Sequence, residues 1–222
     1  MSADSLYYRG AARLSFARAI SARARSNVFG LFMRQMRPHA NSKILDIGSS
    51  DEEGPETNML ERLYPWPKQI TAVGLGEGRV FSKRYASSYL QIEAGKLLPF
   101  ADKAFDIAWS NAVLEHVGGQ SDRAAFVAEI RRVSRRAFVI VPNRWFPIEH
   151  HTAIPLLHWS APAFRYMLRG TPMSHWTKPR FMDFLSRRLL CREFPEATVI
   201  YAGFHLGPFS SNLALVFRDA VS

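Results

Sequence analysis

The sequence predicts an α/β fold: a wound, seven-stranded, mostly parallel sheet flanked by helices, with an N-terminal helical cap and an insertion after the fifth strand. Seven short β-rich runs alternate with helical or turn-like stretches, and most of them are apolar on successive residues. Continuous apolar runs are typical of strands that crossover helices bury on both faces. The runs are 43–47, 69–75, 88–92, 105–109, 137–141, 197–201 and 213–217.

The length and composition favour one domain with one sizeable core, since the chain has 222 residues and is 47% hydrophobic. Cys191 is its single cysteine, which excludes an intramolecular disulfide framework and favours a reducing, cytoplasmic location. No apolar run approaches the roughly 20 residues that a membrane-spanning helix needs. The expected parts of the domain are a cap (1–40), a core (43–142), an insertion (143–188) and final strands (189–222).

The first forty residues predict one or two amphipathic helices, separated near Ser26 and Asn27. This Arg-, Ser- and Ala-rich beginning is also typical of a transit peptide or of a helix that lies on an anionic membrane. We favour a cap helix because the apolar stripe runs almost into the first strand. Peripheral membrane contact through this basic helix stays open. The stripe consists of Ala12, Phe16, Ile20, Val28, Leu31, Phe32 and Met36.

Residues 121–136 are predicted to form a crossover helix with Ser121 as its N-cap. Phe126, Ile130 and Val133 would form its apolar face. Cations are favoured at the negative end of the helix dipole, which is where the arginines crowd. These arginines are Arg131, Arg132, Arg135 and Arg136.

The insertion breaks the alternation of strands and helices with many prolines, four histidines and three tryptophans. A crossover normally needs about a dozen residues, so this segment is additional. In open α/β sheets, material beyond the carboxyl ends of the strands covers the ligand crevice. The insertion is therefore the candidate segment for recognising a second ligand.

Charge is distributed unevenly within the net charge of +10. Residues 1–45 carry eight Lys/Arg and one acid, residues 46–115 carry seven and eleven, and residues 116–222 carry fourteen and seven. An acidic middle between basic flanks suggests a cationic ligand near the middle and an anionic one near the flanks. The alternative is that the basic flanks only keep the protein soluble.

The first strand leads from Asp46 through Gly48 into a turn of small residues, followed by Asp51, Glu52 and Glu53; a helix is expected to start near Pro55 or Glu56. Such a strand-turn-helix unit lets backbone amides approach a ligand. A dinucleotide motif would have three glycines here, and the acids would repel a pyrophosphate. They suit a ligand that carries a sulfonium and an ammonium. A P-loop is absent as well.

The stretch Leu98–Asp106 (LPFADKAFD) and its continuation Trp109–Val117 (WSNAVLEHV) resemble the "LPF.D..FD...S..VLEHV" signature of class I S-adenosylmethionine-dependent methyltransferases. The likeness to this family runs from about Lys43 to Pro142. It implies a Rossmann-like fold, S-adenosylmethionine as cofactor, and a methyltransferase whose core (43–142) binds that cofactor.

The resemblance also implies which residues bind the cofactor. Those at the methionine end follow the first strand, those near the ribose follow the second, those near the adenine follow the third, and those of the pocket floor end the fourth. In that order they are Asp46, Gly48, Ser49 and Ser50; Gly76 and Glu77; Glu93 and Ala94; Ser110 and Asn111. The chain departs from the family pattern at Ser50/Glu52, at Gly76 and at Ala94. Two alternatives stay open, since Asp46 could cap the turn and Glu77 could be a solvated loop acid.

Methyl transfer requires alignment of the acceptor and exclusion of water, and a hydroxyl acceptor also has to lose a proton. Candidate bases are His116, just after the fourth strand, and Glu149, His150 and His151 in the insertion. Each could instead be a polar packing group. Consecutive side chains converge poorly on one ion, so no metal site is predicted.

The leading hypothesis is methyl transfer to an oxygen or nitrogen atom of a small or glycan/lipid-like acceptor. Basic and aromatic residues together in the second half suit an anionic acceptor. An RNA methyltransferase is an alternative, although the Asn-Pro-Pro-aromatic motif is missing and Cys191 lacks a neighbouring proline. A non-catalytic binding protein at membrane or nucleic acid is another. An enzyme should be stabilised against thermal unfolding by the cofactor, whereas a non-catalytic binding protein should not.

Overall fold

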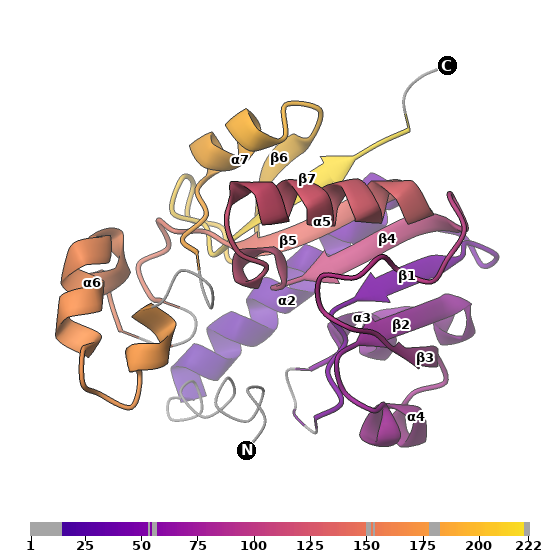
Figure 1. Ribbon diagram of the computed structural model, residues 1–222, viewed down its shortest axis with the longest axis horizontal. Coiled ribbons are helices and arrows are strands. Elements are labelled where there is room, and N and C mark those ends of the chain that lie inside the picture. Colours follow the sequence, from indigo (N-terminus) through magenta and orange to yellow (C-terminus); the bar gives the residue numbers. More distant parts are fainter. Residues whose placement is uncertain are drawn as a thin grey trace.

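The computed structural model describes residues 15–52, 54, 57–149, 152, 154–177 and 183–219. Within them a seven-stranded sheet has the order β3-β2-β1-β4-β5-β7-β6, with β7 antiparallel to both of its neighbours (Figure 1). All seven predicted strands are confirmed, and so is the fold class. The strands are β1 (Ile44–Ile47), β2 (Ile70–Gly74), β3 (Ser88–Gln91), β4 (Phe105–Asn111), β5 (Ser134–Pro142), β6 (Thr198–Ala202) and β7 (Asn212–Phe217).

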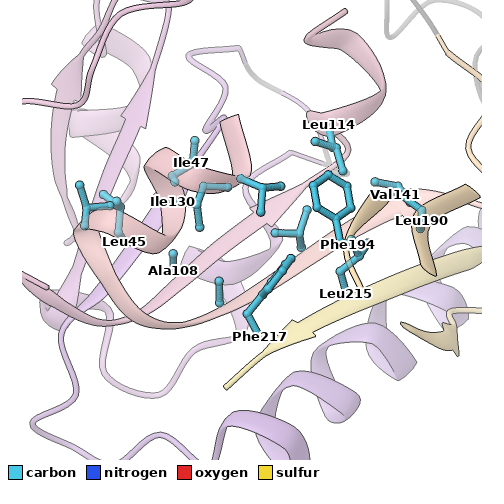
Figure 2. Close-up of a cluster of buried hydrophobic side chains, with 14 of the residues drawn as sticks. Leu45, Ile47, Ala108, Leu114, Ile130, Val141, Leu190, Phe194, Leu215 and Phe217 are labelled. Atoms are coloured by element: carbon cyan, nitrogen blue, oxygen red, sulfur yellow. The ribbon is translucent and has the colours of Figure 1, made fainter. Parts of the chain in front are cut away.

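Alternate residues of the central strands enter two separate cores, one on each face of the sheet. One core packs against α5 (Gln120–Val133) and α7 (Arg187–Glu193), and Figure 2 shows part of it, including Ile130 and Phe194. The other packs against α2 (Ser15–Met36) and α3 (Met59–Leu63). Burial on both faces explains why the strand sequences are apolar on successive residues.

Helix α2 crosses the face of the sheet opposite α5 (Figure 1). Phe32 is completely buried, and its ring meets the edge of Trp109 on β4 at a centroid distance of 4.9 Å. The predicted separation near Ser26 and Asn27 is wrong, because the helix is continuous there. The Asn27 side-chain amide donates to the carbonyl of Gly203 at 3.0 Å, so this polar residue has a partner without breaking the helix.

Helix α5 is shorter than expected at its C-terminal end and begins one residue earlier. Gly119 stands at the N-cap, and Asp122 accepts a hydrogen bond from its amide, so Ser121 is not the cap. Residues 134–136 belong to β5, since Ser134 and Arg136 pair with β4 in the parallel ladder. Arg135 and Arg136 therefore lie on a strand rather than at the helix end.

The insertion consists of short helices that leave the sheet after β5 and project beyond one end of it (Figure 1). Phe164, Leu168 and Trp176 form a small core of their own. Within the described residues, no helix combines the length and the hydropathy needed to cross a membrane. The other helical elements are α4 (Arg79–Arg84), α6 (Ala161–Leu168), and the 3-10 turns η1 (Pro67–Gln69), η2 (Leu114–His116), η3 (Leu157–Trp159) and η4 (Ser174–Thr177).

Candidate active site

The predicted cofactor residues meet at one edge of the sheet. Strands β1 to β4 are mutually parallel, so their carboxyl ends lie side by side. Ile47, the last residue of β1, pairs with Val73 of β2 and Ser110 of β4. Every residue expected to contact the cofactor therefore lies at this edge, in the segments 46–50, 76–77, 93–94 and 110–111.

The turn after β1 is held by backbone and side-chain hydrogen bonds. The amides of Gly48 and Ser49 donate to the carbonyl of Val73 at 2.9 and 3.0 Å. Asn58 accepts from the amide of Ser50 and donates to its carbonyl, both at 2.8 Å. Helix α3 begins at Met59, directly after Asn58. The expected helix start near Pro55 or Glu56 falls on residues outside the described part of the chain.

Two buried carboxyl groups lie behind this turn. Asp46 accepts a hydrogen bond from the Ser49 hydroxyl at 2.8 Å, and burial raises the pKa of Asp46 to about 6. Glu61 of α3 faces it, and its pKa is raised well above its usual range by burial and by the Asp46 charge. Neither oxygen of Glu61 receives a hydrogen bond from a described residue. Burial thus favours the neutral form of both carboxyls, and most strongly that of Glu61, where the Asp46 charge adds to it.

Asp51, the first acid after the turn, has a different role from the expected one. The carboxylate of Asp51 accepts hydrogen bonds from three backbone amides and thereby caps α4; they belong to Arg79, Val80 and Phe81. Asp51 also explains the departure at Gly76, because a Cβ there would lie 2.7 Å from the Asp51 Cβ. Asp51 is thus a structural cap, and Glu53 lies outside the described residues.

Most of the residues expected near the ribose and adenine are exposed, and Gly76 is half-buried. Glu77 pairs with Arg79, and its side chain is 60% exposed. Glu93 pairs with Lys96, and Ala94 beside it is exposed as well. These ion pairs are solvated and contribute little to stability, so both carboxylates are available to a ligand at this edge.

The floor of the edge and the nearest candidate base come from the end of β4. Ser110 is buried, and its hydroxyl has no hydrogen-bond partner among the described residues. His116 follows in η2, where its ring lies 6.3 Å from that of Trp176 in the insertion. The amide of Asp183 donates to the carbonyl of Glu115 at 2.8 Å. The insertion therefore returns to the site edge beside His116.

The other predicted bases lie within the insertion. Glu149 is buried, and its carboxylate accepts from the amide and the hydroxyl of Thr152 at 2.5 and 2.7 Å. It also acts electrostatically on His158, whose pKa is nevertheless lowered by burial. His150 and His151 lie outside the described residues. The structure thus brings His116 to the edge with the cofactor residues and holds Glu149 inside the insertion.

The residues of this edge fit S-adenosylmethionine. Its methionine end carries an ammonium and a sulfonium, and the buried Asp46–Glu61 pair offers negative charge beside the end of β1. The unpaired Ser110 hydroxyl offers a further polar contact on the floor. Sequence patterns did not reveal Glu61, because its contact with Asp46 depends on how α3 packs under β1.

The comparisons with known proteins agree with this geometry. Residues 45–140 match the family model described as a methyltransferase domain. No curated protein matches the chain.

Solved structures share the fold at low sequence identity. Magnesium protoporphyrin IX methyltransferase from Synechocystis PCC 6803 superposes with a TM-score of 0.59 at 12% identity, over 97% of this chain and 92% of that one. A SAM-dependent methyltransferase from Methanosarcina mazei superposes with a TM-score of 0.57 at 12% identity, over 86% of this chain and 98% of that one. For N-methyltransferase NodS from Bradyrhizobium japonicum WM9, the TM-score is 0.54 and the identity is 13%, over 94% of this chain and 89% of that one. Residues 45–140 are therefore a methyltransferase domain, and the chain has the fold of S-adenosylmethionine-dependent methyltransferases.

Proposed function

We propose that this methyltransferase acts on an oxygen or nitrogen atom of a small or glycan/lipid-like acceptor held between the carboxyl edge of the sheet and the insertion. One observation carries the proposal. The insertion returns to the edge through the hydrogen bond from Asp183 to Glu115, and it packs Trp176 beside His116. An acceptor at this position would lie under the insertion, which would shield it from water.

Bound S-adenosylmethionine supplies an electrophilic methyl group on its sulfonium. In the proposed arrangement, Asp46, Gly48, Ser49 and Ser50 hold its methionine end, with Glu61 behind Asp46. Gly76 and Glu77 lie by the ribose, Glu93 and Ala94 by the adenine, and Ser110 and Asn111 form the floor.

His116 is the proposed base for a hydroxyl acceptor. Its side chain is 25% exposed, and Nε2 lies 3.8 Å from a carboxylate oxygen of the buried Glu115. A carboxylate at this distance would favour the imidazolium that forms when the ring accepts a proton from the acceptor. Glu149 ranks behind His116 as a candidate base. Its carboxylate is buried and already accepts a hydrogen bond from Thr152, so it is less accessible to an acceptor.

Thermal unfolding with S-adenosylmethionine and S-adenosylhomocysteine tests the cofactor part of the proposal. At about a hundred times the dissociation constant, a ligand stabilises a protein by about 2.7 kcal/mol. Wild type should show this gain, and Asp46→Ala should lose it. Equal melting of both proteins at saturating cofactor would reject the assigned site.

The acceptor class is tested by measuring S-adenosylhomocysteine release with different acceptors. We expect turnover with a phosphorylated sugar or lipid-linked hydroxyl or amine, and none with RNA. Salt-sensitive methylation of RNA would support the alternative function instead.

We also propose a cytoplasmic location with peripheral membrane contact through the basic N-terminal helix. Arg23 and Arg34 of α2 are exposed, whereas Val28, Phe32 and Met36 are buried against the sheet. Any contact by this part of α2 would therefore be electrostatic. Vesicle sedimentation of Arg23→Glu/Arg34→Glu tests it, and unchanged binding would reject it.

A further inference from the structure

Exposed apolar side chains are concentrated in two segments of the chain. Most of the large exposed apolar residues among the described part lie either in the insertion or in the loop between β6 and β7. They are Trp145, Ile148, Leu156, Tyr166, Met167, Leu206 and Phe209. Clustered exposed apolar surface on a soluble chain marks an interaction site more often than single exposed residues do.

Ring contacts join the two segments into one surface. Trp145 and Trp159 meet edge to face at 5.9 Å, and Trp159 stacks on Phe209 at 5.7 Å. Leu156, which is exposed, is tied to this row through the backbone, because its carbonyl accepts from the amide of Trp159. Ile148 adjoins Leu156 through the bridge between Ile148 and Pro155. Leu206 adjoins Phe209, whose amide donates to the Leu206 carbonyl at 3.1 Å. We call this surface the aromatic patch; it consists of Trp145, Ile148, Leu156, Trp159, Leu206 and Phe209.

Acids are scarce in the segments that carry the patch, and Asp183 of the insertion is paired with Arg123. The sequence has no Asp or Glu at residues 150–182 or 197–218, and the nearby Glu149 is buried. Cations are present in the insertion: the Arg144 guanidinium lies 5.3 Å from the Trp145 ring centroid, and Arg165 on α6 and Arg169 directly after it are exposed. The insertion therefore carries apolar and cationic surface, and Arg144 places one cation directly at Trp145.

The aromatic patch lies at the same edge of the sheet as the cofactor residues. Pro142, the last residue of β5, pairs with Asn212, the first residue of β7. Trp145 follows the end of β5, and Phe209 precedes the start of β7, so both leave the sheet at its carboxyl edge. A partner bound to the patch would be close to the methyl donor.

We propose that the aromatic patch docks on a lipid bilayer that contains anionic phospholipids. Tryptophan and phenylalanine rings bury well at the level of the headgroups, and arginines nearby pair with lipid phosphates. Exposed Ile148, Leu156 and Leu206 favour a bilayer over a nucleic acid, because aliphatic groups gain little from stacked bases. The docked enzyme would present its cofactor edge to acceptors at the membrane surface.

Vesicle sedimentation with the full chain tests the apolar part of this surface. Wild type should pellet with phosphatidylcholine vesicles that contain phosphatidylglycerol, and much less with phosphatidylcholine alone. Trp145→Ala/Phe209→Ala should weaken binding by at least about tenfold. The matched control is Leu75→Ala/Leu97→Ala, which removes two exposed apolar side chains near β2 and β3 and should bind as wild type does.

A second pair of variants tests the charges. Arg165→Glu/Arg169→Glu should weaken binding to the anionic vesicles by at least about tenfold, whereas Lys68→Glu/Lys83→Glu, which makes the same change of net charge on η1 and α4, should have a smaller effect. The proposal is overturned if wild type does not pellet with anionic vesicles, if the patch variants pellet as wild type does, or if the controls lose binding equally. Each variant must retain its melting temperature and its stabilisation by S-adenosylhomocysteine, which separates a failure of docking from a failure of the assigned cofactor site.

Discussion

The side chain of Val113 occupies the space that a Cβ at residue 48 would need. A Cβ built on Gly48 would lie 2.2 Å from one γ-methyl of Val113, and Gly48 has a φ of +98°. The turn after β1 therefore depends on glycine for both its conformation and its close approach to the segment after β4.

Gly48→Ala should destabilise the protein by about 2–4 kcal/mol, because strain and overpacking add at this position. Gly48→Ala/Val113→Ala should recover the part that comes from the clash and leave the backbone strain of about 1 kcal/mol. Urea denaturation of the two single variants and the double variant measures the coupling. Strictly additive losses would show that the two side chains do not compete for space.

The Asp46–Glu61 pair predicts how stability depends on pH. Both pKa values are raised on folding, so the folded chain binds protons more tightly than the unfolded chain. The favourable contribution is complete below the ordinary carboxyl pKa and is lost as the pH rises through about 6 for Asp46 and through a higher value for Glu61.

Glu61→Gln tests this dependence. The amide can still donate to Asp46 but does not ionise, so the free energy of unfolding should fall less steeply above pH 6 than in wild type. Urea denaturation between pH 5 and pH 9 without cofactor gives the difference. Parallel curves for wild type and variant would mean that Glu61 does not titrate in this range.

Arg123 should contribute far more to stability than a surface arginine on the same helix. It is buried and pairs with Glu193 of α7 at 2.7 Å and with Asp183 at 2.6 Å. Arg123→Met leaves the buried Glu193 carboxylate unpaired, which should cost about 3–5 kcal/mol. Arg131→Met breaks an exposed pair with Glu196 and should cost less than about 1 kcal/mol. Similar losses in chemical denaturation would contradict the difference in burial.

His116→Gln should slow methyl transfer to a hydroxyl acceptor by about a hundredfold or more, because general bases typically supply that much. Binding of S-adenosylhomocysteine, measured by calorimetry, should stay unchanged. In wild type, the rate should fall at acidic pH as the imidazole becomes protonated. His175→Gln is the control, since that ring also contacts Trp176, at 4.5 Å. A normal rate in His116→Gln would assign the base elsewhere.

Local patterns in the sequence were sufficient to predict the sheet. The seven strands and the burial of Val28, Phe32 and Met36 follow from runs of apolar residues and from helical spacing. The motif residues from Asp46 to Asn111 could be assigned to one edge because the carboxyl ends of parallel strands point to the same edge of the sheet. Boundaries were harder: Arg135 and Arg136 join β5, since pairing with β4 outweighs the helical pattern.

The tertiary structure decided which acids serve the fold and which face the site. Asp51 and Glu61 are both acids near the first turn. Asp51 caps α4, whose first residue lies 28 positions later in the chain, whereas Glu61 faces Asp46. The sequence determined where the strands run, because burial of apolar side chains is a local and repetitive signal. Only the packed structure decided the partners of these carboxyls, because each partner comes from a different element whose position depends on the whole fold.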